Sequence, residues 1–210
     1  MSEKDKLERA YALDGLEDVT ALYRDWAATY DTDFAEAGGF RMPALIGAAF
    51  AELRGEGPVL DAGCGTGLVA DHLDPRLAID GVDISREMLA VARAKGRYRA
   101  LHEADLTGPL PFADASYRGL VSSGTFTHGH VGPDALHDLL RCLAPGGACA
   151  ITTNATYMAA VGFHDVLDRL VSEGRIGNLV LREERIYDTP GGAPEGHGED
   201  MGYIVTFLRT

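Results

Sequence analysis

Apolar residues recur along the chain in two alternating patterns. One is a helical spacing, as at Ile46, Phe50 and Leu53, where Pro43 suits the first helical turn. The other is a short apolar run bounded by turn residues, and it predicts strands at 59–61, 77–83, 97–103, 117–123, 148–153, 179–187 and 203–208. Strands that alternate with helices predict a mostly parallel sheet with helices on both faces.

Capping and breaking residues indicate where the intervening helices begin and end. Ser85 is a candidate N-cap and Pro133 a first helical residue, whereas Pro145-Gly146-Gly147 would end the helix that follows Pro133. Helical patterns also cover 66–73 and 163–171. Only a Gly/Pro-rich loop at 189–198 separates the last two strands, so we expect them to be antiparallel.

The whole pattern predicts an α/β fold of the Rossmann-like kind. Its sheet would be doubly wound, mostly parallel and seven-stranded, with an antiparallel last strand. A length of 210 residues fits one domain with a full core. We therefore predict a single domain over 1–210, in which helices in an N-terminal cap at 1–55 form a lid on the core at 56–210.

Composition and charge narrow the classes of partner. The 32 acidic residues outnumber the 19 Lys and Arg, for a formal net charge of −13, so a nucleic-acid substrate is disfavoured because phosphate contacts need a basic surface. No apolar run approaches the roughly 18 residues of a membrane span, and the charged N-terminus does not resemble a signal peptide. The three cysteines lack metal-ligand spacing. We expect a cytoplasmic protein without membrane or metal, either a monomer or a homodimer.

A glycine-rich turn follows the first predicted strand. The segment Asp61-Ala62-Gly63-Cys64-Gly65-Thr66-Gly67 supplies glycines that permit a tight turn and a close approach of backbone to a ligand. A dinucleotide site would show G-x-G-x-x-G, but Leu68 stands where the third glycine of that pattern would be. The spacing therefore disfavours NAD and favours another adenosine-containing ligand.

Acidic residues follow the next two predicted strands. Asp83 lies 20 residues after Gly63, a separation at which a carboxylate can accept hydrogen bonds from both ribose hydroxyls. Asp105 lies just after the third strand and could accept from an adenine amino group, with Leu106 against the ring. Three strand ends with one polar contact each indicate an adenosine site better than turn chemistry alone does.

These motifs resemble those of class I S-adenosylmethionine-dependent methyltransferases over nearly the whole chain. Leu60–Gly67 looks like their glycine-rich motif, Gly81–Ser85 their acidic second-strand motif, Ala104–Leu106 their adenine-side motif, and Leu143–Gly147 the turn before their fifth strand. More narrowly, segments 26–31, 38–43 and 61–69 are similar to the methyltransferase-like proteins named after the Williams–Beuren chromosome region.

The resemblance implies a cofactor, S-adenosyl-L-methionine, and a set of residues that hold it. Asp61 and Gly63 would face its methionine part, Tyr30 would cover that end with Arg41 near the carboxylate, and Ser122 or Ser123 would lie near the sulfonium. The full implied set is Tyr30, Arg41, Asp61, Ala62, Gly63, Cys64, Gly65, Asp83, Ile84, Met88, Asp105, Leu106 and Ser122.

A general base is needed only if the methyl acceptor must lose a proton. His128, in the loop after the fourth strand, is a candidate base, and a loop histidine without a catalytic role is the alternative. His128, His130 and His137 could suggest a metal site, but the only nearby carboxylates that could complete the ligand set are Asp134 and Asp138, which suit a solvated helix face.

The leading hypothesis for function is an S-adenosylmethionine-dependent methyltransferase that acts on a small molecule. The motifs do not identify the acceptor. Two alternatives are an S-adenosylmethionine-binding protein without transferase activity and a nicotinamide-dependent oxidoreductase, which the glycine spacing disfavours.

Overall fold

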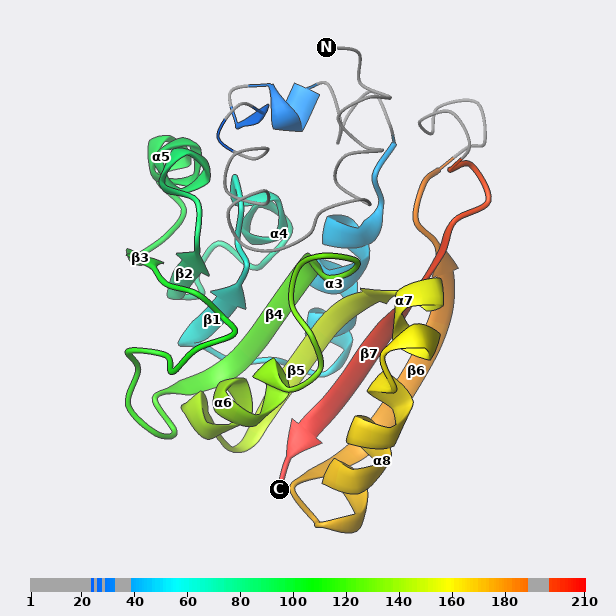
Figure 1. Cartoon of the computed structure of the whole chain (residues 1–210). Coiled ribbons are helices and arrows are strands. Elements are labelled where there is room, and N and C mark those ends of the chain that lie inside the picture. The colour runs from blue at the N-terminus through cyan, green and yellow to red at the C-terminus, as the bar shows by residue number, and fades with distance from the viewer. Residues whose placement is uncertain (1–23, 25, 28, 33–38, 189–196) are drawn as a thin grey trace.

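In the computed structural model of the chain, the described residues are 24, 26, 27, 29–32, 39–188 and 197–210 (Figure 1). The elements follow in the order α3 (Met42–Glu52), β1 (Val59–Ala62), α4 (Leu68–Asp71), β2 (Ile79–Asp83), α5 (Arg86–Lys95), β3 (Ala100–Glu103), β4 (Tyr117–Phe126), α6 (Ala135–Cys142), β5 (Leu143–Asn154), α7 (Ala155–Ala160), α8 (Phe163–Ser172), β6 (Ile176–Arg185) and β7 (Met201–Arg209). Most of the N-terminal cap expected from the sequence lies outside the described residues.

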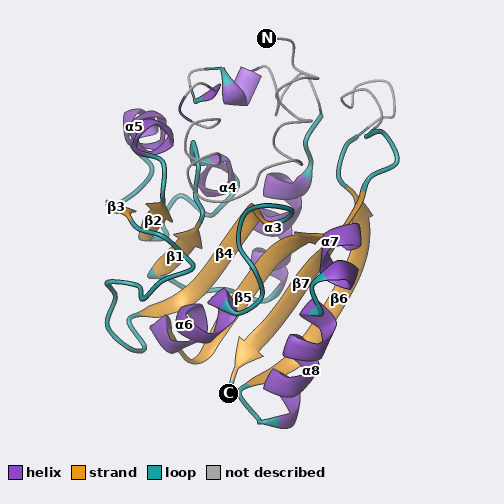
Figure 2. Cartoon of the chain, in the orientation of Figure 1, coloured by secondary structure: helices purple, strands orange, loops and turns teal. Residues whose placement is uncertain are grey.

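One seven-stranded sheet organises the fold, in the order β3-β2-β1-β4-β5-β7-β6. Strands β1 to β5 pair in parallel, and β7 runs antiparallel to both β5 and β6. The predicted α/β class, the doubly wound sheet and the antiparallel last strand are confirmed. Figure 2 shows the strands as a twisted layer between helices.

Alternate residues along the central strands enter two separate cores, as expected for a sheet that is buried on both faces. On one face, Leu60, Leu120 and Ile151 join apolar residues of α6, α7 and α8. On the other face, Val59 and Val121 join those of α3 and α4. Helix α3 thus packs on the sheet itself, although it lies within the range predicted as a cap.

Two helix boundaries differ from the predictions. Helix α6 begins at Ala135, after Asp134 at the N-cap position, so Pro133 is not the first helical residue as predicted but lies before the helix. The predicted stop at Pro145-Gly146-Gly147 is also wrong, since α6 ends at Cys142 and those residues fall in β5. The β4–β5 register shifts between the pairs Tyr117–Leu143 and Gly119–Ala148. Pro145, which cannot donate a hydrogen bond to the sheet, lies in the part of β5 between those pairs.

The predicted N-cap Ser85 is confirmed, because its Oγ accepts a hydrogen bond from the Met88 backbone N–H at 3.2 Å. This cap fixes where α5 begins after β2. Along the described part of the chain, no helix is long and apolar enough to cross a membrane.

Candidate functional site

The carboxyl ends of β3, β2, β1 and β4 lie at one edge of the sheet, where a pocket opens. The chain runs outward from β1 to β3 and then returns to place β4 on the other side of β1, so this edge holds the switch in strand order at which α/β sheets bind ligands. The pocket is lined by Tyr30, Phe40, Pro43, Gly63, Cys64, Gly65, Thr66, Leu68, Val69, Asp83, Ile84, Met88, Ala104, Asp105, Leu106, Thr107, Ser123, Gly124, Thr125, Gly129, His130 and Val131.

The glycine turn after β1 forms the floor of the pocket. The Gly63 and Cys64 backbone N–H groups donate to the Val82 carbonyl at 2.8 and 3.0 Å, which ties the turn to β2. Gly63 has φ +68°, and a Cβ there would overlap the Thr125 side chain. Gly65 has φ +51°, but a Cβ there would meet no atom within 4 Å. Gly65 therefore leaves open space on the side of the pocket, as a close-fitting ligand would require.

Asp83 is held in place by backbone donors at both carboxylate oxygens. The Gly65 N–H donates to Oδ2 at 2.8 Å and the Ser85 N–H to Oδ1 at 2.9 Å. Burial raises the pKa of Asp83 above its usual value, although these hydrogen bonds oppose the shift. Each oxygen keeps further acceptor capacity, so the carboxylate can accept from two neighbouring hydroxyls in the pocket.

The end of β3 closes one side of the pocket. Asp105 accepts hydrogen bonds from the Thr107 N–H at 2.8 Å and the Thr107 hydroxyl at 2.7 Å, which orients its carboxylate. Leu106 is buried beside it, and Ile84 and Met88 complete an apolar wall. Such a slot suits a flat ring with one polar edge.

Asp61, Ala62 and Ser122 support the turn from below and do not line the pocket. The Ser122 hydroxyl donates to the Ala62 carbonyl at 2.6 Å, and both residues are buried. The Tyr98 hydroxyl donates to Asp61 Oδ2 at 2.7 Å, while Oδ1 is buried without a hydrogen-bond partner among the described residues. Burial raises the pKa of Asp61 from 3.8 to about 7, although the hydrogen bond from Tyr98 opposes this shift. A buried acceptor without a donor leaves capacity for a cationic ligand group or a water.

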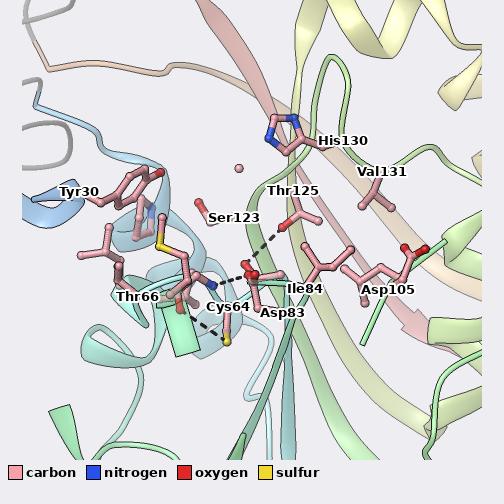
Figure 3. Close-up of a pocket in the computed structure, with 18 of the residues that line it drawn as sticks. Tyr30, Cys64, Thr66, Asp83, Ile84, Asp105, Ser123, Thr125, His130 and Val131 are labelled. Carbon is pink, nitrogen blue, oxygen red and sulfur yellow. Dashed lines mark hydrogen bonds between the residues drawn. The ribbon is translucent and has the colours of Figure 1, made fainter. Parts of the chain in front are cut away.

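The N-terminal side of the pocket comes from Tyr30, Phe40 and Pro43. Arg41, next to Phe40, does not line the pocket, because its guanidinium pairs with Asp188 at 3.1 Å and lies 4.0 Å from Glu184. Figure 3 shows Tyr30 and Asp105 on opposite sides of the pocket, with Asp83 and Cys64 between them.

The loop after β4 supplies the remaining wall, and here the structure separates two histidines. His130 lines the pocket, whereas His128 does not and its ring instead meets that of Tyr157 at 5.2 Å. His130 Nδ1 lies 2.7 Å from the His128 carbonyl oxygen, so Nδ1 carries the proton and Nε2 is the acceptor nitrogen. Burial lowers the pKa of His130, which keeps the imidazole neutral near pH 7.

Nine of the thirteen residues expected to bind cofactor thus gather around one pocket: Tyr30, Gly63, Cys64, Gly65, Asp83, Ile84, Met88, Asp105 and Leu106. Sequence reasoning missed Phe40, Pro43, Thr66, Thr125, His130 and Val131 as lining residues. Two signals pointed toward some of them, since Phe40 and Pro43 lie in a segment that carried the family resemblance and His130 neighbours His128. No cluster of three or more metal-ligating side chains occurs within the described ranges.

Solved structures share this architecture. A methyltransferase from Thermotoga maritima that depends on S-adenosylmethionine superposes with a TM-score of 0.63 at 16% identity, over 91% of this chain and 99% of that one. Another, from Methanococcus maripaludis, has a TM-score of 0.58 at 15% identity, over 91% and 93%. The order of the strands, and the pocket at the carboxyl ends of β3, β2, β1 and β4, are therefore those of the class I methyltransferase fold.

Sequence comparison goes further than the fold. A family model described as a methyltransferase domain matches residues 59–147. Human methyltransferase-like protein 27 is 32% identical over 187 residues, which cover 83% of this chain and 75% of the relative. A malonyl-[acyl-carrier protein] O-methyltransferase from Enterobacter lignolyticus is 35% identical over 98 residues, 46% of this chain and 39% of its own length. The chain belongs to the S-adenosylmethionine-dependent methyltransferases, which confirms the resemblance seen in its motifs.

Proposed function

We propose that the chain transfers a methyl group from S-adenosylmethionine to an uncharged small molecule. The observation that carries the proposal is the charge distribution in the pocket. Asp83 and Asp105 are its acidic lining residues, both near the ends of β2 and β3, and its described lining contains no Lys or Arg. An anionic acceptor would find no countercharge there, and the side toward β4 offers apolar and neutral polar contacts to a neutral one.

The residues present fit the methyl donor. Gly65 leaves room for a ligand against the turn, and Asp83 has two oriented oxygens for ribose hydroxyls. Asp105 and Leu106 offer a polar edge and an apolar face to adenine, with Ile84 and Met88 against the ring.

When bound, S-adenosylmethionine supplies a methyl group on a positively charged sulfur, so the protein mainly has to align the acceptor and exclude water. Tyr30, Phe40 and Pro43 would cover the donor's methionine end and exclude water. The Ser123 hydroxyl, buried without a hydrogen-bond partner among the described residues, would contact ligand at the end of β4. If the acceptor is a hydroxyl, the His130 Nε2 would take its proton. His128, the base candidate from the sequence, would shape this loop through Tyr157.

Binding and turnover test the proposal separately. Titration calorimetry with S-adenosylhomocysteine should give saturable heat, and absence of both heat and a thermal shift at millimolar ligand would sink the donor assignment. Release of S-adenosylhomocysteine is then measured against matched panels of neutral, anionic and cationic small molecules and a peptide library. Turnover confined to anionic compounds or peptides would reject the proposed acceptor class, and binding without any turnover would favour a protein that binds the donor without transferring methyl.

A further inference from the structure

Asp31 lies in the N-terminal segment, by which we mean the described residues among 24–32, and it connects this segment to the glycine turn and to helix α5. It directly follows Tyr30, a pocket residue, and its carboxylate accepts a hydrogen bond from the Thr66 hydroxyl in the glycine turn. The same carboxylate lies 2.7 Å from the Lys95 ammonium at the C-terminal end of α5. One side chain thus joins three segments that are far apart in the sequence.

The ion pair is sheltered from solvent. The Asp31 and Lys95 side chains are 25% and 24% exposed, so solvent screens their attraction less than it would at the surface. Burial alone would lower the pKa of Lys95, but hydrogen bonds to Asp31 and Asp71 outweigh it and raise that pKa above its usual value. Lys95 therefore stays charged and bridges the two carboxylates, with Asp71 of α4 at 3.0 Å.

A second anchor lies on the other side of Tyr30. Trp26 is 1% exposed and belongs to the core formed with α3. Its ring meets the Tyr30 ring edge-on, with centroids 5.0 Å apart. Tyr30 is therefore held between a buried tryptophan and a carboxylate bound to the pocket floor (Figure 3 shows Tyr30 above Thr66).

We propose that Asp31 is a positioning residue that latches the N-terminal segment to the glycine turn and α5, and so holds Tyr30 over the pocket. Thr66 is 1% exposed and lies between Gly65 and Gly67, so the latch contacts the same turn that the methyl donor would contact. Binding at the turn and closure of the latch then favour each other reciprocally, and ligand release requires Asp31 to leave Thr66 and Lys95. This inference rests on the proposed donor site.

The test compares Asp31→Ala with Asp71→Ala, since each removes one carboxylate from Lys95 but only Asp31 belongs to the N-terminal segment. Trp26 is the one tryptophan in the sequence, so its fluorescence reports on that segment alone. In ligand-free protein, Asp31→Ala should raise acrylamide quenching of Trp26 at least twofold, and Asp71→Ala should leave it unchanged. With S-adenosylhomocysteine as the probe, Asp31→Ala should raise Kd about fivefold or more, mainly through faster dissociation in stopped flow, and Asp71→Ala should stay within about twofold.

Equal changes of quenching and Kd in the two variants would show that the charge balance at Lys95 matters and the latch does not. Unchanged quenching and affinity in Asp31→Ala would also overturn the proposal. If Asp31→Ala fails to fold, Asp31→Asn and Lys95→Met replace it, because each removes the ion pair with little change in size and should show the same direction. Wild-type protein that does not bind S-adenosylhomocysteine would reject the donor site, whereas quenching in the ligand-free state still decides the latch.

Discussion

Substitution of Gly65 tests whether the methyl donor binds against the glycine turn, because Gly96 provides a matched control position. Gly65 lies in the pocket floor and Gly96 at the C-terminal end of α5, and both have positive φ, at +51° and +68°. A Cβ built at either position meets no protein atom within 4 Å. The two glycines therefore differ mainly in whether the added methyl group would point toward the pocket.

Alanine at either position pays the same kind of backbone penalty. A left-handed conformation costs an L-residue about 1–2 kcal/mol, which for a chain of this length lowers Tm by about 2–8 °C. No steric penalty adds to it, because neither Cβ meets a neighbour. We expect Gly65→Ala and Gly96→Ala to lose similar stability in urea and thermal unfolding.

Their ligand affinities should separate. In Gly65→Ala the new methyl group occupies space that the donor would fill, and we expect Kd for S-adenosylhomocysteine in calorimetry to rise at least tenfold, about 1.4 kcal/mol. Gly96→Ala should bind within about twofold of wild type. Equal affinities in the two variants would refute the placement of the donor against Gly65, whatever their stabilities.

Three further predictions concern ionisable groups. Asp83→Ala should weaken S-adenosylhomocysteine binding by about 1–3 kcal/mol in calorimetry, because it removes an oriented acceptor at the turn; unchanged affinity would contradict the ribose assignment. The pKa of Asp61 is about 7 in the folded protein and 3.8 for an ordinary Asp, so between these pH values the native state holds a proton that the unfolded chain has lost. The unfolding free energy should therefore fall by up to about 4 kcal/mol as pH rises from 4 to 8. Urea titrations should show this fall shrinking in Asp61→Asn, and an identical pH dependence would refute it. For any hydroxyl acceptor found, His130→Gln should remove the acidic limb of the pH–rate profile below about pH 6.5 without changing donor affinity, and a retained limb would exclude His130 as the base.

Patterns that repeat locally predicted most of the fold. Short apolar runs bounded by turn residues, such as 59–61, predicted the central strands. A sheet that is buried on both faces needs apolar residues at successive positions, and Val59 and Leu60 accordingly enter opposite cores. Helix ends were less predictable because several residue types can begin a helix. Pro133 and Asp134 are adjacent candidates, and the structure uses Asp134 as the residue before α6.

Within the site, successive side chains of a strand point to opposite sides, so two adjacent candidates from the sequence have different surroundings. Ser122 turns to the Ala62 carbonyl while Ser123 lines the pocket, a difference of one residue in register. The direction of Arg41 depends on Asp188 and Glu184, which lie more than 140 residues further along the chain. No local spacing contains that information.

The two halves of the pocket therefore differ in how far sequence can identify them. The half that we propose binds the donor consists of strand ends whose glycine and acid spacing is local. Those motifs lie within residues 59–147, the span of the methyltransferase-domain match. The other half also needs Tyr30, Phe40 and Pro43, which lie outside that span and reach the pocket only through tertiary packing. Two relatives are named for different acceptors, malonyl-[acyl-carrier protein] and phosphatidylethanolamine, and their matches cover 46% and 38% of this chain. We therefore expect the acceptor to be recognised by the shape and charge of the other half, where Tyr30 and His130 lie.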